Sequence, residues 1–347
     1  MTEPQITSAE LTPAQVTGIL TLADAAGETD GVAPLSEHVL LHLRYDSSQP
    51  GPRLGRDFVL TVNGEIAGYA YLDPPEPAAQ DSPAPDSPGP RQPGVRETPA
   101  GEVSGELVVH PGHRRQGLGH ALVRALADEA NGHTLRLWAH GDLSAAARLA
   151  AATGFERFRA LWQMRRSLRD PLDRPHFPAG RRLRTFVPGH DEDEWLSLNG
   201  RAFAKHPEQG AWTRHDLDLR EREPWFDPAG FFIAETDGLM AGFHWTKVLP
   251  EAEQGGSRGS SAGQSGAPET SAPQDVGEVY VVGVDPAEQG NGLGRALTLA
   301  GLHYLRDLGL TQAMLYVDED NMPAIRLYDA LGFTRTRTDA MYRQQRR

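Results

Sequence analysis

Cysteine is absent from this chain of 347 residues. Its absence excludes disulfides, thiolate metal sites and a cysteine nucleophile, and we expect no metal centre. No apolar run approaches the roughly 18 residues of a membrane-spanning helix, and the start Met1-Thr-Glu-Pro lacks the basic residues of a signal peptide. We therefore expect a cytoplasmic protein.

Positive charge is also in short supply. The chain has 34 Lys and Arg residues against 47 Asp and Glu residues, which gives a net charge of −13. Phosphate backbones and anionic membranes attract basic surfaces, so we expect neither nucleic acid nor a membrane as a partner. The acidity suits a cationic substrate such as an amine, although acidity also serves solubility alone. Charge by itself leaves the function open.

One fourteen-residue pattern occurs twice, 175 positions apart: VHPGHRRQGLGHAL from Val109 and VDPAEQGNGLGRAL from Val284. Each copy follows a β-branched run and opens an apolar-periodic segment, which predicts a strand, a glycine-rich turn and a helix. Glycines let backbone N–H groups approach an anion, and the helix dipole adds positive potential there. The pattern therefore predicts one phosphate-binding turn in each half.

The arrangement of these segments predicts two α/β domains of one kind in tandem. In each half a helical segment precedes a hairpin, whose turn is Asn63-Gly64 in the first half and Asp237-Gly238 in the second. We place the domains at residues 1–168 and 181–347, with residues 169–180 as the linker.

Two segments interrupt the repeat at the same point, just before the strand that leads into the glycine turn. Residues 73–100 contain nine prolines, and residues 251–275 are small and polar without an aromatic. Neither segment can bury enough apolar surface to offset its ordering entropy. We expect both to be disordered insertions.

Other phosphate-binding turns fit this chain less well. In a dinucleotide-binding fold the glycine turn comes early and has a different spacing, and a triphosphate loop needs Gly-Lys-Ser or Gly-Lys-Thr, which does not occur. Both copies resemble the acetyl-CoA-binding turn of the GCN5-related N-acetyltransferases, Gln/Arg-x-x-Gly-x-Gly/Ala. The resemblance implies an α/β fold with a mixed sheet and splayed central strands, present twice, and acetyl-CoA as the acyl donor.

Longer strings resemble the mycothiol synthases, tandem members of that family from actinobacteria. They are HPEQG at 206–210, WFDP at 225–228, GFHWTKV at 242–248, GEVYVVGVDP at 277–286 and LYVDEDN at 315–321. This resemblance implies acetyl transfer from acetyl-CoA to the cysteinyl amine of cysteinyl-glucosaminyl-inositol, by direct attack in a ternary complex. Two alternatives stay open: an N-acetyltransferase for another small-molecule or peptide amine, and a non-enzymatic acetyl-CoA-binding module. A fused pair can supply the interface that separate subunits obtain by dimerising, so we expect a monomer.

The second half is expected to be the catalytic one. Aligning the glycine turns pairs Glu278 with Val103, and aligning the Gly-Phe pairs at the ends of the halves matches Tyr328 with Ala150. Glu278 is the expected base for the amine, directly or through water, and the resemblance implies Tyr328 as the acid for the departing thiolate. The first half is expected to be non-catalytic. His206, which has no orienting partner in the sequence, is expected to be structural.

The resemblance also implies the binding residues. The acceptor contacts are Glu37, Glu208, Lys247, Glu278 and Tyr316. The acetyl-CoA contacts in the second half are Val282, Gly283, Val284, Gln289, Gly290, Asn291, Gly292, Leu293, Gly294, Arg295, Asn321, Met322, Pro323, Ala324, Ile325 and Arg326. The equivalent contacts for a second, non-reacting acetyl-CoA in the first half are Leu107, Val108, Val109, Arg115, Gln116, Gly117, Leu118, Gly119 and His120.

Several of these positions carry a chemical expectation of their own. Gly283 within a strand predicts a bulge or a close backbone approach, and an N–H freed there would polarise the thioester carbonyl. Arg114 and Arg115 add guanidiniums for phosphate oxygens. Gly290 and Asn291 stand where the family often has arginines, so phosphate binding in the second half would depend more on backbone N–H groups.

Overall fold

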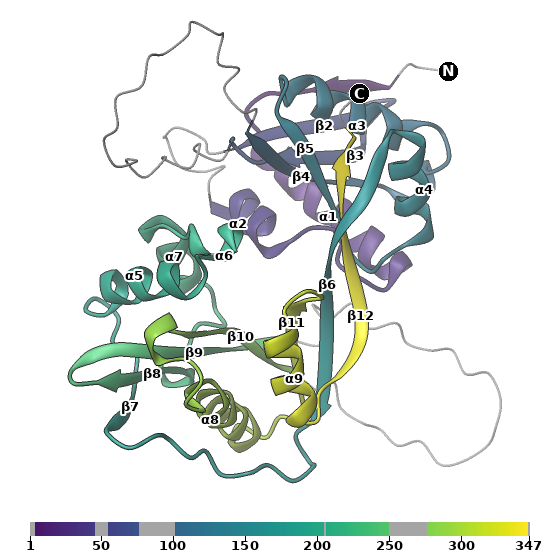
Figure 1. Ribbon diagram of the computed structural model, residues 1–347. Helices are drawn as coiled ribbons and strands as arrows, with labels where there is room; N and C mark the ends of the chain where they lie inside the picture. Colours follow the sequence, from purple (N-terminus) through teal and green to yellow (C-terminus); the bar gives the residue numbers. More distant parts are fainter. Residues whose placement is uncertain (1–3, 46–54, 76–100, 205, 250–275, 346–347) are drawn as a thin grey trace, which may run out of the picture. The chain divides into compact units, whose positions relative to one another are not determined.

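The computed structural model describes residues 4–45, 55–75, 101–204, 206–249 and 276–345 (Figure 1). Nearly all of the two predicted insertions lies outside these residues. The chain divides into two compact units: unit 1 is Met1–Ala160 with Asp339–Arg347, and unit 2 is Leu161–Thr338. Within the described ranges, no helix combines the length and apolarity needed to cross a membrane.

Unit 1 is a mixed sheet with helices on its faces. Its elements are β1 (Gln5–Thr7), α1 (Pro13–Asp30), α2 (Glu37–Tyr45), β2 (Arg56–Val62), β3 (Glu65–Leu72), β4 (Glu102–Val109), α3 (Leu118–Glu129), β5 (Thr134–Ala139), α4 (Ser144–Ala152), the first part of β6 (Phe155–Ser167) and the last part of β12 (Thr334–Gln344). Strands β1 to β5 lie in sequence order and β12 follows β5. Among the described strands of this unit, β4 and β5 pair in parallel, whereas β1–β2, β2–β3, β3–β4 and β5–β12 are antiparallel.

Unit 2 repeats this plan. Its elements are β7 (Arg181–Thr185), α5 (Glu192–Ala202), α6 (Pro207–Gly210), α7 (Arg214–Glu221), β8 (Phe231–Thr236), β9 (Leu239–Leu249), β10 (Val276–Val284), α8 (Leu293–Asp307), β11 (Gln312–Asp318), α9 (Met322–Ala330), the last part of β6 and the first part of β12. Strands β7 to β11 lie in sequence order and β6 follows β11. Between the strands that the structure describes here, β10 and β11 pair in parallel, whereas β7–β8, β8–β9, β9–β10 and β6–β11 are antiparallel. The predicted mixed α/β fold, present twice, is confirmed.

Local chemistry explains where these elements begin and turn. Helix α1 starts after Thr12, whose side chain and that of Gln15 form a reciprocal capping box. The predicted hairpins are present, because Asn63 (φ 53°) and Asp237 (φ 52°) each precede a glycine that also has positive φ. Two consecutive positive φ angles are what a tight two-residue hairpin turn requires.

The unit boundaries differ from the predicted linear ones, because two strands are shared. Strand β6 begins in unit 1 and ends in unit 2, where it pairs with β11. Strand β12 begins in unit 2 and ends in unit 1, where it pairs with β5. Residues 169–180, the predicted linker, therefore fall inside unit 2.

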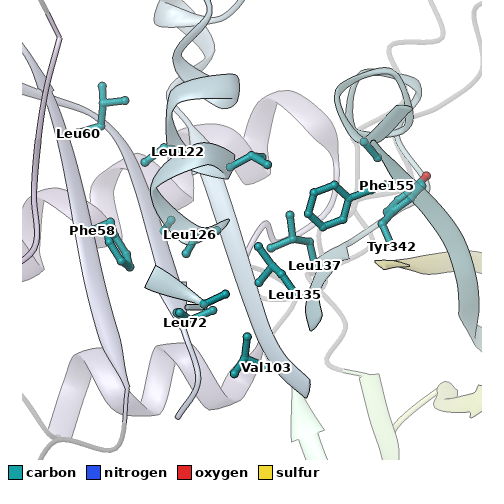
Figure 2. Packing of buried hydrophobic residues seen from close by; sticks show 14 of the residues in the cluster. Phe58, Leu60, Leu72, Val103, Leu122, Leu126, Leu135, Leu137, Phe155 and Tyr342 are labelled. Carbon is teal, nitrogen blue, oxygen red and sulfur yellow. The ribbon is translucent and has the colours of Figure 1, made fainter. Parts of the chain in front are cut away.

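The core of unit 1 shows this exchange at the level of side chains. Helix α3 packs against the sheet through residues such as Leu122 and Leu126 (Figure 2). Tyr342, from the end of β12, lies near Phe155 in the same cluster. The last residues of the chain are thus part of the core of its first unit.

In unit 2 the two faces of the sheet are covered by different helices. On one face, α8 and α9 pack on Val279 and Leu315. On the other, α5 and α7 pack on an aromatic cluster that includes Phe243 and Trp245. We call these the α8 face and the α5 face.

Candidate active site

The two glycine turns have the geometry expected for phosphate binding. Gly290 and Gly292 have φ angles of 82° and 89°, and in unit 1 the same positions are Arg115 (66°) and Gly117 (84°). Helices α3 and α8 begin directly after these turns, and their N-cap residues are the glycines Gly117 and Gly292, which have no side chain to cap the helix. Uncapped N–H groups at the positive end of a helix fit the phosphates of acetyl-CoA.

The first residue of each turn has the same structural role. Gln289 donates from Nε2 to the carbonyl oxygen of Val284 at 3.2 Å, and Arg114 donates from Nε to that of Val109 at 3.1 Å. Arg114 also binds both carboxylate oxygens of Asp30 at 2.7 Å. The expectation that Arg114 provides a guanidinium for phosphate is therefore wrong, because the group is already paired; Arg115 is exposed.

The second-half cofactor residues are also partly committed to local contacts. Asn291 accepts a hydrogen bond from the N–H of Leu293, and its amide lies 3.4 Å from Glu288. Asn321 caps α9 by accepting from the N–H of Ala324. These asparagines hold the starts of α8 and α9, to which the predicted acetyl-CoA contacts at residues 293–295 and 322–326 belong.

The central strands separate in both units, as predicted. Strand β4 pairs with β5 from Glu102 to Gly105, and β10 pairs with β11 from Gly277 to Val279. Within the described strands this parallel pairing stops there, although β4 and β10 continue to Val109 and Val284. The residues predicted to contact the acetyl-CoA arm lie in these stretches, which pair with β3 and β9 on one side and leave their parallel neighbours on the other.

A bulge distinguishes the two separated strands. In unit 2, Val279 lies opposite Thr246 and Val281 lies opposite Trp245, so Tyr280 is an extra residue. In unit 1 the register of β3 and β4 is regular from Gly68 to Leu72. The bulge predicted at Gly283 is therefore at Tyr280, and only in unit 2.

Gly283 is instead a site of close approach, the other half of its prediction. A Cβ atom there would lie 2.5 Å from the ring of Phe243.

The Tyr280 bulge also corrects the sequence alignment of the two halves. Counting back from the glycine turn through the extra residue, the position equivalent to Glu278 is Ser104, and Val103 is its neighbour. Unit 1 still has no carboxylate at this position.

Glu278 and Lys247 lie side by side on the α5 face. They are opposite each other in the β9–β10 register, and both are buried. The Lys247 ammonium lies 4.6 Å from the centre of the Trp225 ring and 5.5 Å from that of Tyr280. Cation–π contact of this kind holds a desolvated ammonium in place. A carboxylate and a fixed cation thus occur together where β10 leaves β11.

Tyr316 continues this face along β11. It is 41% exposed, and its hydroxyl accepts a hydrogen bond from Gln163 Nε2 at 3.1 Å. Two residues further along the strand, Asp318 lies 2.7 Å from Nε2 of His206. The sequence showed no sign of this partner for His206, because 112 residues separate the two and no local pattern links them.

Tyr328 lies on the other side of the sheet. It belongs to α9 and packs into the α8-face cluster, with its ring 5.8 Å from that of Phe333. Burial raises the pKa of Tyr328 to about 12, so its phenol is protonated at neutral pH. The predicted base and the predicted acid therefore approach the separated strands from opposite faces.

Two residues that are predicted to contact the acetyl acceptor lie on helices, near the helix N-termini. Glu37 is the first residue of α2 in unit 1, and Glu208 belongs to the short helix α6 in unit 2. Neither position tests the predicted role.

The carboxylates of unit 1 near the separated strands are engaged. Glu106, the first residue of β4 beyond its pairing with β5, accepts from the N–H of Ser36 at 2.7 Å and lies 3.7 Å from His140. His140 also lies 3.1 Å from Asp339. Burial alone would lower the pKa of His140, but Asp339 and Glu106 outweigh it and raise the pKa to about 10. This imidazolium binds both carboxylates, so neither Glu106 nor Asp339 is available as a base corresponding to Glu278.

Comparison with known proteins agrees with this geometry. Residues 30–155 and 194–333 match the Acetyltransferase (GNAT) family, and the chain belongs to this family of acyltransferases. Membership implies acetyl-CoA as the acyl donor. A relative named mycothiol acetyltransferase, from Thermobispora bispora, is 53% identical over 96% of this chain and 97% of its own length. Another of that name, from Thermomonospora curvata, is 52% identical over 96% and 94%.

A solved structure supports the fold independently. A tandem GNAT protein from the clavulanic acid biosynthesis pathway has a TM-score of 0.64 at 22% identity, covering 98% of each chain. At this identity the likeness concerns the fold alone. The resemblance to the mycothiol synthases, predicted from the sequence, is confirmed by the relatives named mycothiol acetyltransferase.

Proposed function

We propose that the chain acetylates the cysteinyl amine of cysteinyl-glucosaminyl-inositol, the last step of mycothiol biosynthesis. Unit 2 is the catalytic unit and the protein acts as a monomer. The observation that carries this proposal is Glu278, a buried carboxylate beside the separated strands of unit 2, where unit 1 has Ser104. The names of the relatives support the choice of acceptor.

Glu278 takes the proton of the amine. An α-amine has a pKa near 8, so much of it is an ammonium at neutral pH and must lose a proton before it attacks. A carboxylate on the α5 face attracts the ammonium and accepts that proton, directly or through one water. Lys247, fixed against Trp225, keeps a second positive charge next to Glu278 and favours the carboxylate form.

Acetyl-CoA supplies the thioester whose carbonyl the neutral amine attacks. The Tyr280 bulge and the end of β10 that has left β11 supply backbone N–H groups for the carbonyl oxygen. Tyr328 holds its proton on the α8 face and donates it to the departing thiolate sulfur. Attack from one face and protonation from the other need no covalent enzyme intermediate, which suits a chain without cysteine.

The test of the proposed function is CoA release from acetyl-CoA with three acceptors. Cysteinyl-glucosaminyl-inositol is compared with free cysteine and with glucosaminyl-inositol. Fast release only with the full conjugate supports the proposal. Equal CoA release with free cysteine or glucosaminyl-inositol would favour an N-acetyltransferase for other amines. No CoA release with any amine would favour a non-enzymatic acetyl-CoA-binding module.

A second, non-reacting acetyl-CoA in unit 1 is part of the proposal. Arg115 has a left-handed backbone (φ 66°), which costs a non-glycine residue free energy, whereas unit 2 has Gly290 there. An arginine kept in such a conformation at a phosphate turn supports a phosphate contact. We expect Arg115→Gly to weaken acetyl-CoA binding at one of two sites about 10-fold, with little change in Tm because glycine tolerates the angle.

Calorimetric titration of the full chain with acetyl-CoA measures this effect. Arg124→Ala is the matched control, because Arg124 is exposed on the same helix, away from the turn. A single site in the wild type, or two sites that Arg115→Gly leaves unchanged, would contradict the second acetyl-CoA.

A further inference from the structure

The α5 face of unit 2 carries a guanidinium that the proposed chemistry does not use. Glu278 lies beside Met314 in the β10–β11 register, and Met314 lies opposite Arg165 in the β11–β6 register. Residues in one cross-strand row point to the same face of a sheet. Lys247, Glu278, Met314 and Arg165 therefore form one row on the α5 face, with Arg165 roughly 10 Å from Glu278.

Arg165 is half-buried without a counter-charge. In the part of the chain that the structure describes, its guanidinium has no hydrogen bond or ion pair. Burial lowers the pKa of Arg165, Arg337 lowers it further, and Tyr316 acts in the opposite direction. Removing a guanidinium from water without a partner costs free energy. The desolvated guanidinium lies near Tyr316, which is predicted to contact the acetyl acceptor.

Neighbouring arginines show the contrast. Arg166, on the α8 face, donates to the carbonyl oxygens of Leu331 and Pro171. Arg335 stacks over the ring of Trp162 at 4.6 Å. Both guanidiniums contact other groups of the unit, whereas no such contact is found for that of Arg165 among the described residues.

The ligand of Arg165 follows from the charges along the row. A guanidinium presents a fork of N–H donors and no acceptor, so it binds oxygen-rich groups and repels a second ammonium. Gln163 and Tyr316 lie next to it and add polar groups. A molecule with its amine at Glu278 and a polyol reaching towards Arg165 would satisfy the whole row.

We propose that Arg165 binds hydroxyl groups of the acceptor's glucosaminyl-inositol portion and selects for an acceptor that carries them. This inference rests on the proposed function, because the amine of the same acceptor is placed at Glu278. The row then orients the acceptor. Its single ammonium lies at the carboxylate, and its hydroxyls lie at the guanidinium.

The test compares two acceptors, cysteinyl-glucosaminyl-inositol and cysteinamide, with four forms of the full-length enzyme. These are the wild type, Arg165→Gln, Arg165→Lys and the control Arg335→Gln. We expect Arg165→Gln to lower the ratio of kcat/KM for the conjugate over that for cysteinamide about 10- to 100-fold, through KM rather than kcat. Arg165→Lys, which keeps the charge and loses the fork, should fall in between, and Arg335→Gln should keep the wild-type ratio.

The two proposals fail in different arms of this experiment. A wild type that does not prefer the conjugate over cysteinamide would overturn the proposed function. A wild type that prefers the conjugate, with the same preference in Arg165→Gln, would overturn only the role of Arg165. Equal losses on both acceptors in Arg165→Gln would assign Arg165 a structural role and overturn the inference as well.

Discussion

Replacing Glu278 with Gln is expected to lower kcat/KM by about 10²- to 10⁴-fold, the usual contribution of a general base. The amide is close in size to the carboxylate but cannot accept the amine proton. The defect should narrow as the pH rises above about 8, because the amine is then already neutral. Initial rates of CoA release from pH 6.5 to 9.5 measure both effects.

The control for Glu278→Gln is Glu102→Gln. Glu102 begins the equivalent strand of unit 1 and is paired with Arg136, away from the proposed chemistry. It should retain nearly full activity. Acetyl-CoA binding by Glu278→Gln should match the wild type. A defect that stays constant across this pH range, or that is accompanied by lost acetyl-CoA binding, would show that Glu278 is not the base.

Replacing Tyr328 with Phe should lower kcat by about 10²-fold and leave the KM for acetyl-CoA nearly unchanged. Burial raises the pKa of Tyr328 to about 12, above the ordinary value of 10. A raised pKa keeps the phenol protonated, so the acid remains in its active form throughout the neutral and mildly basic range. The wild-type rate should therefore rise as the amine loses its proton near pH 8 and stay level to about pH 10.

Tyr304→Phe is the matched control for this variant. Tyr304 is also a partly buried tyrosine packed against the α8-face cluster, and its hydroxyl donates to Asp227. Its loss should cost stability, about 1 kcal/mol, but not kcat. An alkaline limb below pH 10 that disappears in Tyr328→Phe would contradict the raised pKa. A parallel loss of kcat and acetyl-CoA binding would make Tyr328 a packing residue.

Sequence reasoning predicted the local elements well, because their signals are local. Two-residue turns such as Asn63-Gly64 and glycines before a helix such as Gly292 state their own geometry. The acceptor was predicted from the longer strings that resemble the mycothiol synthases, because hydrophobic periodicity carries no information about a substrate.

What the sequence did not predict depends on contacts between distant residues. Tyr280 looks like any strand residue, and only pairing with β9 makes it an extra one. That single residue moved the equivalent of Glu278 from Val103 to Ser104. Arg114 was predicted to bind phosphate because its actual partner, Asp30, lies 84 positions away and no local pattern shows the ion pair. No sequence pattern singled out Arg165, because the cross-strand row to which it belongs forms only when β6 pairs with β11.

Because β6 and β12 are shared between the units, cutting the gene between its two repeats would not yield two complete domains. A protein ending at residue 168 would lack Ala340 and Tyr342, which belong to the core of unit 1. It would also leave β5 with a bare edge, a template for aggregation. An autonomous first half would have to carry residues 339–347 with it. Duplication produced two copies, but each copy is now completed by residues encoded in the other.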